Sequence, residues 1–283
     1  MPANIWYICD YSILSWHLEQ LKGIIFNPQI FMEKREKVEL IEKYRKANNK
    51  LVLLDYDGTL VNYELIPDNA RLPEHLVDIL IKLIDKPQTK VFIISGRNHE
   101  DIDKLLDHLP ISIIAEHGGT MKEGGEWKNQ IIDNASWKKT IIPILNQVTS
   151  ACPNSYVEEK IFSLTWHYRN SDSQVGYAHS RELIRILEQA IHSYNLKILD
   201  GNKVVEILTN EIGKGKAVKK LSEQNNYDFI LSIGDDATDE EMFEFFLNSP
   251  NAFTIKVGLG NTYAKYKLET IKDVVSLLKR LSG

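Results

Sequence analysis

The stretch LVLLDYDGTL at residues 51–60 decides the fold of this chain. Its four opening apolar residues predict a strand that is buried on both faces. Asp55 ends the apolar run and Asp57 follows two residues later, so both carboxylates can point to the same side of an extended chain. Gly58 permits a sharp turn, and Thr59 offers a hydroxyl and an N–H to an anion. Because open α/β sheets bind ligands beyond the carboxyl ends of their strands, we expect a site here.

The pair Asp55 and Asp57 favours a bound cation. Two carboxylates this close repel each other unless a proton or a cation lies between them. A divalent metal is the simplest reason for such a pair, and Mg²⁺ prefers oxygen ligands. The alternative is a strand that ends in a polar turn, with Asp55 capping a helix.

Composition excludes several classes of partner. The chain has 283 residues, of which 43% are hydrophobic, as expected for a globular protein with a real core. The net charge of −5 argues against a nucleic-acid partner. Two cysteines are too few for a disulfide framework, and no uncharged stretch reaches the roughly 20 residues that span a bilayer. We therefore expect a cytoplasmic protein that binds neither nucleic acid nor membranes.

Strands and helices alternate along most of the chain, which indicates a doubly wound parallel α/β sheet. The expected strands are 51–54, 91–94, 111–115, 229–233 and 253–257, with helices at 33–49, 73–84, 99–109, 213–225, 238–247 and 271–281. The pattern changes in the middle, where a hairpin is expected at 120–127, helices at 137–150 and 175–194, and paired strands at 155–159 with 162–169 and 196–200 with 203–208.

This change divides the chain. We expect an N-terminal helical lead segment at 1–44, an α/β core made of 45–121 and 210–283, and an inserted α+β cap at 122–209.

Polar groups follow three of the predicted core strands and can share one pocket. They are Asp55 and Asp57, then Ser95 with Gly96, then Asp235 and Asp236, and Lys214 opens a helix between the last two. Asp55, Asp235, Asp236 and the backbone carbonyl of Asp57 can hold Mg²⁺. Asp55 can attack phosphorus as a nucleophile, and Asp57 can act as general acid and base. Thr59, Ser95, Gly96 and Lys214 can hold the phosphoryl oxygens.

Each of these features also has a simpler interpretation. Ser95 and Gly96 can form an ordinary turn, and Lys214 can be a solvated helix residue. The acids at 235–240 can be residues that favour a helix N-terminus. It is their recurrence at one edge of the predicted sheet that favours a shared site.

Four motifs resemble those of the haloacid dehalogenase superfamily of phosphotransferases: DYDGTL, SGR, the lysine of GKGKA, and GDDATDE. Asp57 matches its phosphatase branch. Within that superfamily the chain resembles the trehalose-6-phosphate phosphatases. The segments that carry this narrower resemblance are 116–118, 166–169, 203–206 and 234–243, and the resemblance covers about 40–281. It implies a superfamily-type α/β core whose cap closes over the site. It also implies Mg²⁺-dependent hydrolysis of trehalose 6-phosphate to trehalose and phosphate through an aspartyl-phosphate.

The resemblance also implies a set of substrate contacts, in which residues matching Lys203 and Glu206 contact the distal sugar. The full set is Arg97, Glu116, His117, Gly118, Arg169, Lys203 and Glu206. A disaccharide presents many hydroxyls, so a cap rich in polar and aromatic groups is consistent with it. Trp127 and Trp166 can instead be core residues, and Lys203 and Glu206 can form a surface ion pair. After Glu206 the chain has Leu208-Thr209, where the family usually has arginine and proline.

Two alternative functions stay open. One is a related phosphatase that acts on sucrose 6-phosphate or another sugar phosphate. The other is a non-catalytic regulatory partner of a trehalose-phosphate synthase. Residues 1–30 resemble the end of the synthase domain in fused enzymes, so a synthase domain or subunit is an expected partner.

Overall fold

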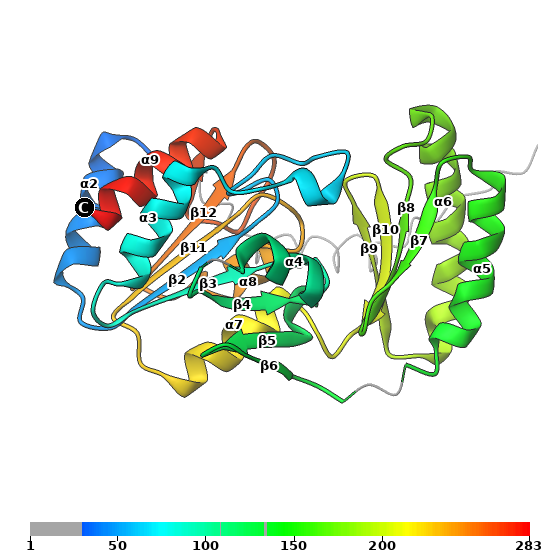
Figure 1. Ribbon diagram of the computed structural model, residues 1–283, viewed down its shortest axis with the longest axis horizontal. Coiled ribbons are helices and arrows are strands. Elements are labelled where there is room, and N and C mark those ends of the chain that lie inside the picture. The colour runs from blue at the N-terminus through cyan, green and yellow to red at the C-terminus, as the bar shows by residue number, and fades with distance from the viewer. Residues whose placement is uncertain (1–29, 108, 133–134) are drawn as a thin grey trace, which may run out of the picture.

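The computed structural model describes residues 30–107, 109–132 and 135–283, and it has two parts (Figure 1). A large core lies on one side and a smaller cap on the other, with the cap sheet facing the core. Within the described ranges, no helix combines the length and the apolar character that a membrane span needs. The predictions for residues 1–29 lie outside the described part of the chain.

The core is built on a nine-stranded sheet. In spatial order its strands are β1 (Ile30–Phe31), β13 (Tyr266–Leu268), β12 (Ala252–Val257), β11 (Phe229–Gly234), β2 (Lys50–Asp55), β3 (Thr89–Ile94), β4 (Ser112–Ala115), β5 (Thr120–Glu123) and β6 (Glu126–Asn129). Neighbours from β1 to β4 are parallel, whereas β5 and β6 run antiparallel to their neighbours. The first five residues of LVLLDYDGTL lie in β2, which is flanked by β11 and β3.

Strand β2 explains the two helical layers. Its side chains alternate, so Val52 and Leu54 join one apolar cluster while Leu51 and Leu53 join another. The first cluster includes residues of α2 (Lys34–Lys46), α3 (Glu74–Ile84), α4 (His99–Leu106) and α9 (Ile271–Ser282). The second includes α7 (Lys214–Gln224) and α8 (Glu240–Phe245). The expected doubly wound core is confirmed.

Local signals set where several helices begin. Capping boxes open α2 at Glu33 and α9 at Thr270, and the side chain of Asn98 caps α4. Pro73 precedes α3, where its missing N–H costs nothing. The starts of α3 and α4 bound the loops that follow β2 and β3, which carry polar motifs.

The cap is an antiparallel sheet covered on one face by two helices. Its strands, in spatial order, are β7 (Tyr156–Glu159), β8 (Ser163–His167), β10 (Val204–Thr209) and β9 (Leu196–Gly201). Helices α5 (Lys138–Ala151) and α6 (Ser173–Ala190) pack on the outer face around Trp166. Trp166 is therefore a core residue of the cap, as is Tyr168, which stacks on it at 4.9 Å.

The hairpin of β5 and β6 corrects one boundary. We expected the cap to begin at 122, but this hairpin pairs with β4 and extends the core sheet to residue 129. Strand pairing continues because Ala115 and Thr120 lie directly opposite each other across a tight turn. Strands β1 and β13 were not predicted.

Candidate active site

A cleft of about 230 Å³ separates the carboxyl ends of the core strands from the open face of the cap sheet. It brings together ten of the predicted site residues: Asp55, Asp57, Ser95, Gly96, Arg97, His117, Arg169, Glu206, Lys214 and Asp236. The sheet register explains the cap side, because Glu206 lies opposite Thr165 on β8 and Thr165 lies opposite Glu158 on β7. The three side chains therefore form one row across the cap sheet.

Gly58 lets two acidic segments approach each other. Its φ is +86°, and an added Cβ would lie 2.1 Å from Oδ2 of Asp235, so only glycine fits between the Asp57 backbone and that carboxylate. Its N–H donates to the carbonyl of Val61 at 2.7 Å, which closes the turn after β2. This turn places the β2 motif directly against the end of β11.

Three carboxylates converge at this point. One oxygen from each of Asp55, Asp235 and Asp239 lies within 4.8 Å of the others. Oδ2 of Asp55 is buried and has no hydrogen-bond partner among the described residues. Asp55 and Asp235, 180 residues apart in the chain, are thus brought together as expected.

The electrostatics of this cluster fit a hard divalent cation. Burial raises the pKa of Asp235 to about 7 and that of Asp239 to about 6, and repulsion from neighbouring carboxylates adds to both. Burial and the adjacent Asp239 likewise raise the pKa of Asp55. An all-oxygen donor set suits Mg²⁺ and similar hard cations, and the unpartnered Oδ2 of Asp55 is a free ligand atom for such an ion.

Lys214 places a positive charge next to two carboxylates of this cluster. Its ammonium donates to Oδ1 of Asp55 at 2.7 Å and to Oδ1 of Asp239 at 2.8 Å. Burial lowers the pKa of Lys214, but the charges of Asp239 and Asp55 outweigh burial and raise it well above its usual range. Lys214 is 2% exposed, so it is not a solvated helix residue.

Asp57 and Arg97 form a bidentate ion pair. Nε of Arg97 lies 2.7 Å from Oδ2 of Asp57, and a terminal nitrogen lies 2.7 Å from Oδ1. The backbone N–H of Arg97 also donates to Oγ of Ser95 at 3.1 Å. Arg97, expected to contact substrate, is therefore oriented toward the second aspartate in this structure.

The carboxylate of Asp236 lies outside the three-carboxylate group. Its Oδ1 accepts from the N–H and the hydroxyl of Thr238 at 2.8 and 2.7 Å, and it lines the cleft. Burial raises the pKa of Asp236, but the charge of Lys214 and these hydrogen bonds lower it below the usual value. Asp239 is the third acid of the cluster instead.

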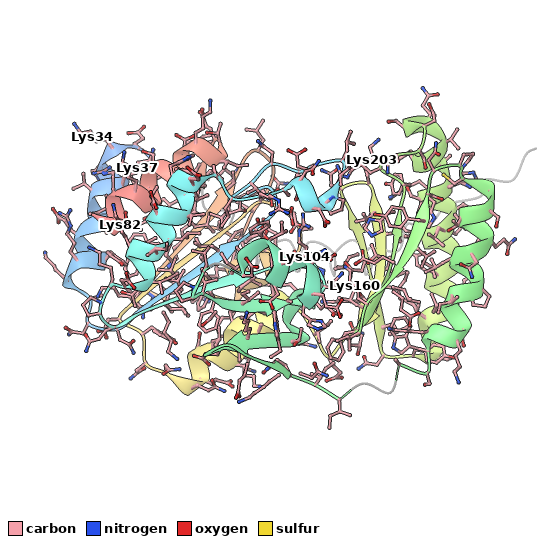
Figure 2. The ribbon with its side chains drawn as sticks, in the orientation of Figure 1. Lys34, Lys37, Lys82, Lys104, Lys160 and Lys203 are labelled. Carbon is pink, nitrogen blue, oxygen red and sulfur yellow. The ribbon has the colours of Figure 1, made fainter. Side chains whose placement is uncertain are left out.

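Glu206 binds partners from both parts of the chain. Its carboxylate accepts from Lys160 at 2.9 Å and from the Ser163 hydroxyl at 2.6 Å, and Nε2 of the core residue His117 lies 3.1 Å away. Lys160 also donates to the carbonyl of Gly96 at 2.9 Å. Figure 2 shows Lys160 where the cap meets the core. Burial opposes ionisation, but Lys160 and His117 hold the pKa of Glu206 well below its usual range.

A family model described as trehalose-phosphatase matches residues 53–272, which span the core motifs and the whole cap. The chain belongs to the trehalose-phosphatase family.

Relatives and solved structures agree with this assignment. A bifunctional trehalose-6-phosphate synthase/phosphatase of Thermoproteus tenax is 39% identical over 252 residues, covering 89% of this chain and 34% of that protein. The trehalose-phosphatase of Saccharomyces cerevisiae is 34% identical over 229 residues, covering 72% and 25%. The trehalose-6-phosphate phosphatase C-terminal domain of C. albicans aligns with a TM-score of 0.83 at 27% identity, covering 90% and 98%. The chain spans about a third of the length of the first curated relatives it matches.

Five of the predicted site residues lie outside the lining of the cleft. They are Thr59, Glu116, Gly118, Lys203 and Asp235, the last of which belongs to the carboxylate cluster. Thr59 is fully buried and its hydroxyl has no partner among the described residues. Glu116 accepts the N–H of Phe162 at 2.9 Å, and half-buried Lys203 donates to Ser173 at 2.7 Å.

Several site residues escaped sequence reasoning. Asp239 lies at the N-cap position of α8, in line with its interpretation as a residue of a helix N-terminus, and its buried carboxylate also accepts the N–H groups of Asp235 and Asp236. Its place in GDDATDE was the available signal. Glu158 and Tyr63 line the cleft without a motif that marks them.

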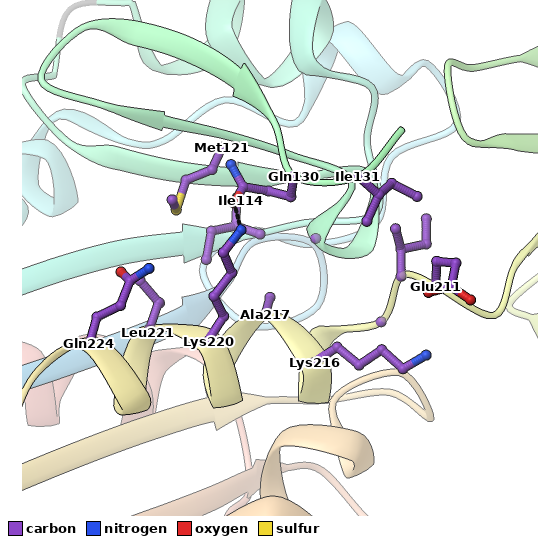
Figure 3. A pocket seen from close by; sticks show the side chains of 13 residues that line it. Ile114, Met121, Gln130, Ile131, Glu211, Lys216, Ala217, Lys220, Leu221 and Gln224 are labelled. Carbon is purple, nitrogen blue, oxygen red and sulfur yellow. Dashed lines mark hydrogen bonds between the residues drawn. The ribbon is translucent and has the colours of Figure 1, made fainter. Parts of the chain in front are cut away.

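Gly118 lines a second, smaller cavity between the β5–β6 hairpin and α7 (Figure 3). Lys220 of α7 reaches across to Gln130 at 2.7 Å. Ile131 and Glu211, from the two connections between core and cap, also border this cavity. It lies beside the connections and holds none of the three clustered carboxylates.

Proposed function

We propose that this chain is a Mg²⁺-dependent phosphatase that hydrolyses trehalose 6-phosphate to trehalose and phosphate through an aspartyl-phosphate on Asp55. The observation that carries the proposal is the meeting of Asp55, Asp235 and Asp239 over Lys214, beneath a polar cap. Family membership favours this substrate over other sugar phosphates.

The residues that would hold Mg²⁺ are Asp55, Asp235 and the backbone carbonyl of Asp57, with Asp236 beside them. When bound, the ion neutralises charge on the phosphoryl group and on the nucleophile. The buried, unpartnered Oδ2 of Asp55 supports this assignment. The choice of Mg²⁺ over other divalent cations is part of the proposal.

In the first step, a carboxylate oxygen of Asp55 attacks phosphorus while the bond from phosphorus to the sugar oxygen breaks. The departing oxygen takes a proton from Asp57. In the second step, Asp57 removes a proton from water, which attacks the phosphoryl group, releases phosphate and restores Asp55. Because Arg97 grips both oxygens of Asp57 here, this ion pair must loosen, and an incoming phosphoryl group offers Arg97 another anion.

Lys214 serves the transferred group as well as the nucleophile. An ammonium has three N–H donors, and Asp55 and Asp239 take two of them. The third can reach a phosphoryl oxygen, since Lys214 lines the cleft. We assign further phosphoryl contacts to Thr59, Ser95 and Gly96, and sugar contacts to Arg169, Lys203 and Glu206.

Phosphate release from a panel of sugar phosphates tests the proposal. Purified chain with Mg²⁺ should act on trehalose 6-phosphate in preference to sucrose 6-phosphate and glucose 6-phosphate, and chelation should stop it. Asp55→Asn should reduce release to background, whereas Asp200→Asn, on a partly exposed cap residue paired with Arg181, should not. Equal or faster turnover of another sugar phosphate would refute the substrate.

The panel also separates the alternative class. A non-catalytic regulatory partner of a synthase would bind without releasing phosphate. The intact cluster of Asp55, Asp57, Lys214 and Asp235 favours catalysis. Since some relatives carry a synthase in the same chain, we propose a synthase domain or subunit as the physiological partner.

A further inference from the structure

Tyr63 lies on the loop after β2 and makes two contacts that point in different directions. Its hydroxyl lies 3.1 Å from Oδ2 and 3.4 Å from Oδ1 of Asp235. The guanidinium carbon of Arg169 lies over the ring of Tyr63, 5.6 Å from the ring centre. Tyr63 also lines the cleft. One side chain of the core thus contacts both a carboxylate of the acidic cluster and a residue of the cap.

The contact with Asp235 is a directed hydrogen bond. A tyrosine hydroxyl is ordinarily protonated at neutral pH, and a carboxylate oxygen only accepts, so the phenol of Tyr63 donates to Asp235. On the other side, the Asp235 carboxylate lies against the backbone of Gly58. The carboxylate is therefore held between a glycine that leaves it space and a hydroxyl that fixes its rotation.

The contact with Arg169 depends on the position of the cap, because Arg169 belongs to the cap and Tyr63 to the core. Arg169 follows β8 and donates to the carbonyl of Asn202, in the turn between β9 and β10, at 2.6 Å. That bond ties the guanidinium to the cap sheet, and the aromatic face below it belongs to the core. A cation over an aromatic ring is attracted to it, so Arg169 holds the ring of Tyr63 in place when the cap is closed.

We propose that Tyr63 is a positioning residue that aligns Asp235 for the divalent cation and does so best when the cap is closed. The inference rests on the proposed function for the identity of the cation, and it does not depend on the sugar. Tyr63 touches neither reacting atom. It acts through Asp235, as partners that orient metal ligands commonly do.

Calorimetric titration of the metal-free full chain with Mg²⁺ tests the inference. Tyr63→Phe keeps the ring and removes the donor, and we expect about tenfold weaker binding. Tyr177→Phe is the matched control, because Tyr177 also carries an arginine over its ring, Arg181 at 5.0 Å, but lies on the exposed side of α6. It should bind Mg²⁺ like the unaltered chain. Equal affinity of Tyr63→Phe and the unaltered chain would overturn the inference.

A second pair of measurements separates positioning from a general structural role. Arg169→Met removes the charge above the ring and should weaken Mg²⁺ binding about threefold; unchanged binding would remove the cap from the inference. Turnover by Tyr63→Phe should recover as Mg²⁺ is raised, whereas a loss that persists at saturating Mg²⁺ would contradict alignment of the ligand. If the unaltered chain releases no phosphate from trehalose 6-phosphate, the proposed function fails while the Mg²⁺ titrations still decide the role of Tyr63.

Discussion

Gly58→Ala should have two effects: strain in the backbone at residue 58 and displacement of the Asp235 carboxylate. The φ of +86° is unfavourable for alanine by roughly 1–2 kcal/mol. The new Cβ would also lie 2.1 Å from Oδ2 of Asp235, where ordinary contacts begin at 3.4 Å, so that carboxylate must move by more than 1 Å. Metal sites tolerate about 0.2 Å, and a misplacement of about 1 Å costs on the order of 100-fold in rate.

Gly125→Ala provides the matched control for Gly58→Ala. Gly125 has a φ of +88° in the β5–β6 turn, and nothing lies within 4 Å of an added Cβ. The Tm measured by circular dichroism should fall by a similar amount in both variants, about 2–8 °C, because both place alanine at a positive φ. Only Gly58→Ala should lose phosphate release and calorimetric Mg²⁺ binding, each by about 100-fold. Equal Mg²⁺ affinity of the two variants would mean that Gly58 does not set the position of the Asp235 carboxylate.

Three other substitutions test the charges described above. Lys214→Met should cost about 3 kcal/mol of unfolding free energy in metal-free urea titrations and less with Mg²⁺, because the ion replaces the lost charge; equal costs would argue against a shared site. Because the pKa of Glu206 is lowered by its partners, its stabilisation is full above about pH 4.3 and is lost as pH falls through the folded pKa. The stability gap between the unaltered chain and Glu206→Gln should therefore be largest near neutral pH and shrink below about pH 4.3; a gap as large at about pH 3 as at about pH 7 would contradict the assigned ion pairs. Lys197→Met removes a partly exposed 2.6 Å ion pair between cap and core, with Glu241, and thermal unfolding should show a loss of at most about 1 kcal/mol; about 3 kcal/mol or more would mean that this pair clamps the cap.

Periodicity predicted the core because burial in this sheet follows directly from hydrophobic runs. Leu51 to Leu54 contribute to both helical layers, and each later strand with a similar run, such as 229–233, takes its place beside them. The convergence of Asp55 and Asp235 followed, since parallel neighbours end at the same edge.

Other features depended on contacts that no local pattern encodes. A hairpin around Gly124 was evident, but not that it would join the core sheet. Strand β13 has only three residues in a lysine-rich segment, too short for a recognisable period. Among the described residues, Lys203 and Glu206 do not form the surface ion pair considered for them. Glu206 pairs with buried Lys160 instead, and Lys203 donates to Ser173.

The sequence pattern also did not predict the side-chain partners of Arg97 and Tyr63. Arg97 was expected to contact substrate, but a bidentate partner lies 40 residues earlier, at Asp57. Tyr63 belongs to no motif, and its hydrogen bond reaches 172 residues along the chain. Specific side-chain pairs across an insertion arise only after the elements pack, so single-sequence patterns do not reveal them.

The position of the cap within the core has a consequence for biosynthesis. Strand β2 emerges from the ribosome with β3 but must wait for β11 to cover its other edge. The intervening cap, at 130–209, delays that partner by roughly 80 residues, on the order of ten seconds at ordinary elongation rates. During this interval a largely apolar strand exposes one edge of unpaired backbone, which is a template for misassociation. The cap has its own apolar core and can pack meanwhile, so the strands that precede the cap are the part of this segment most exposed to misassociation during synthesis.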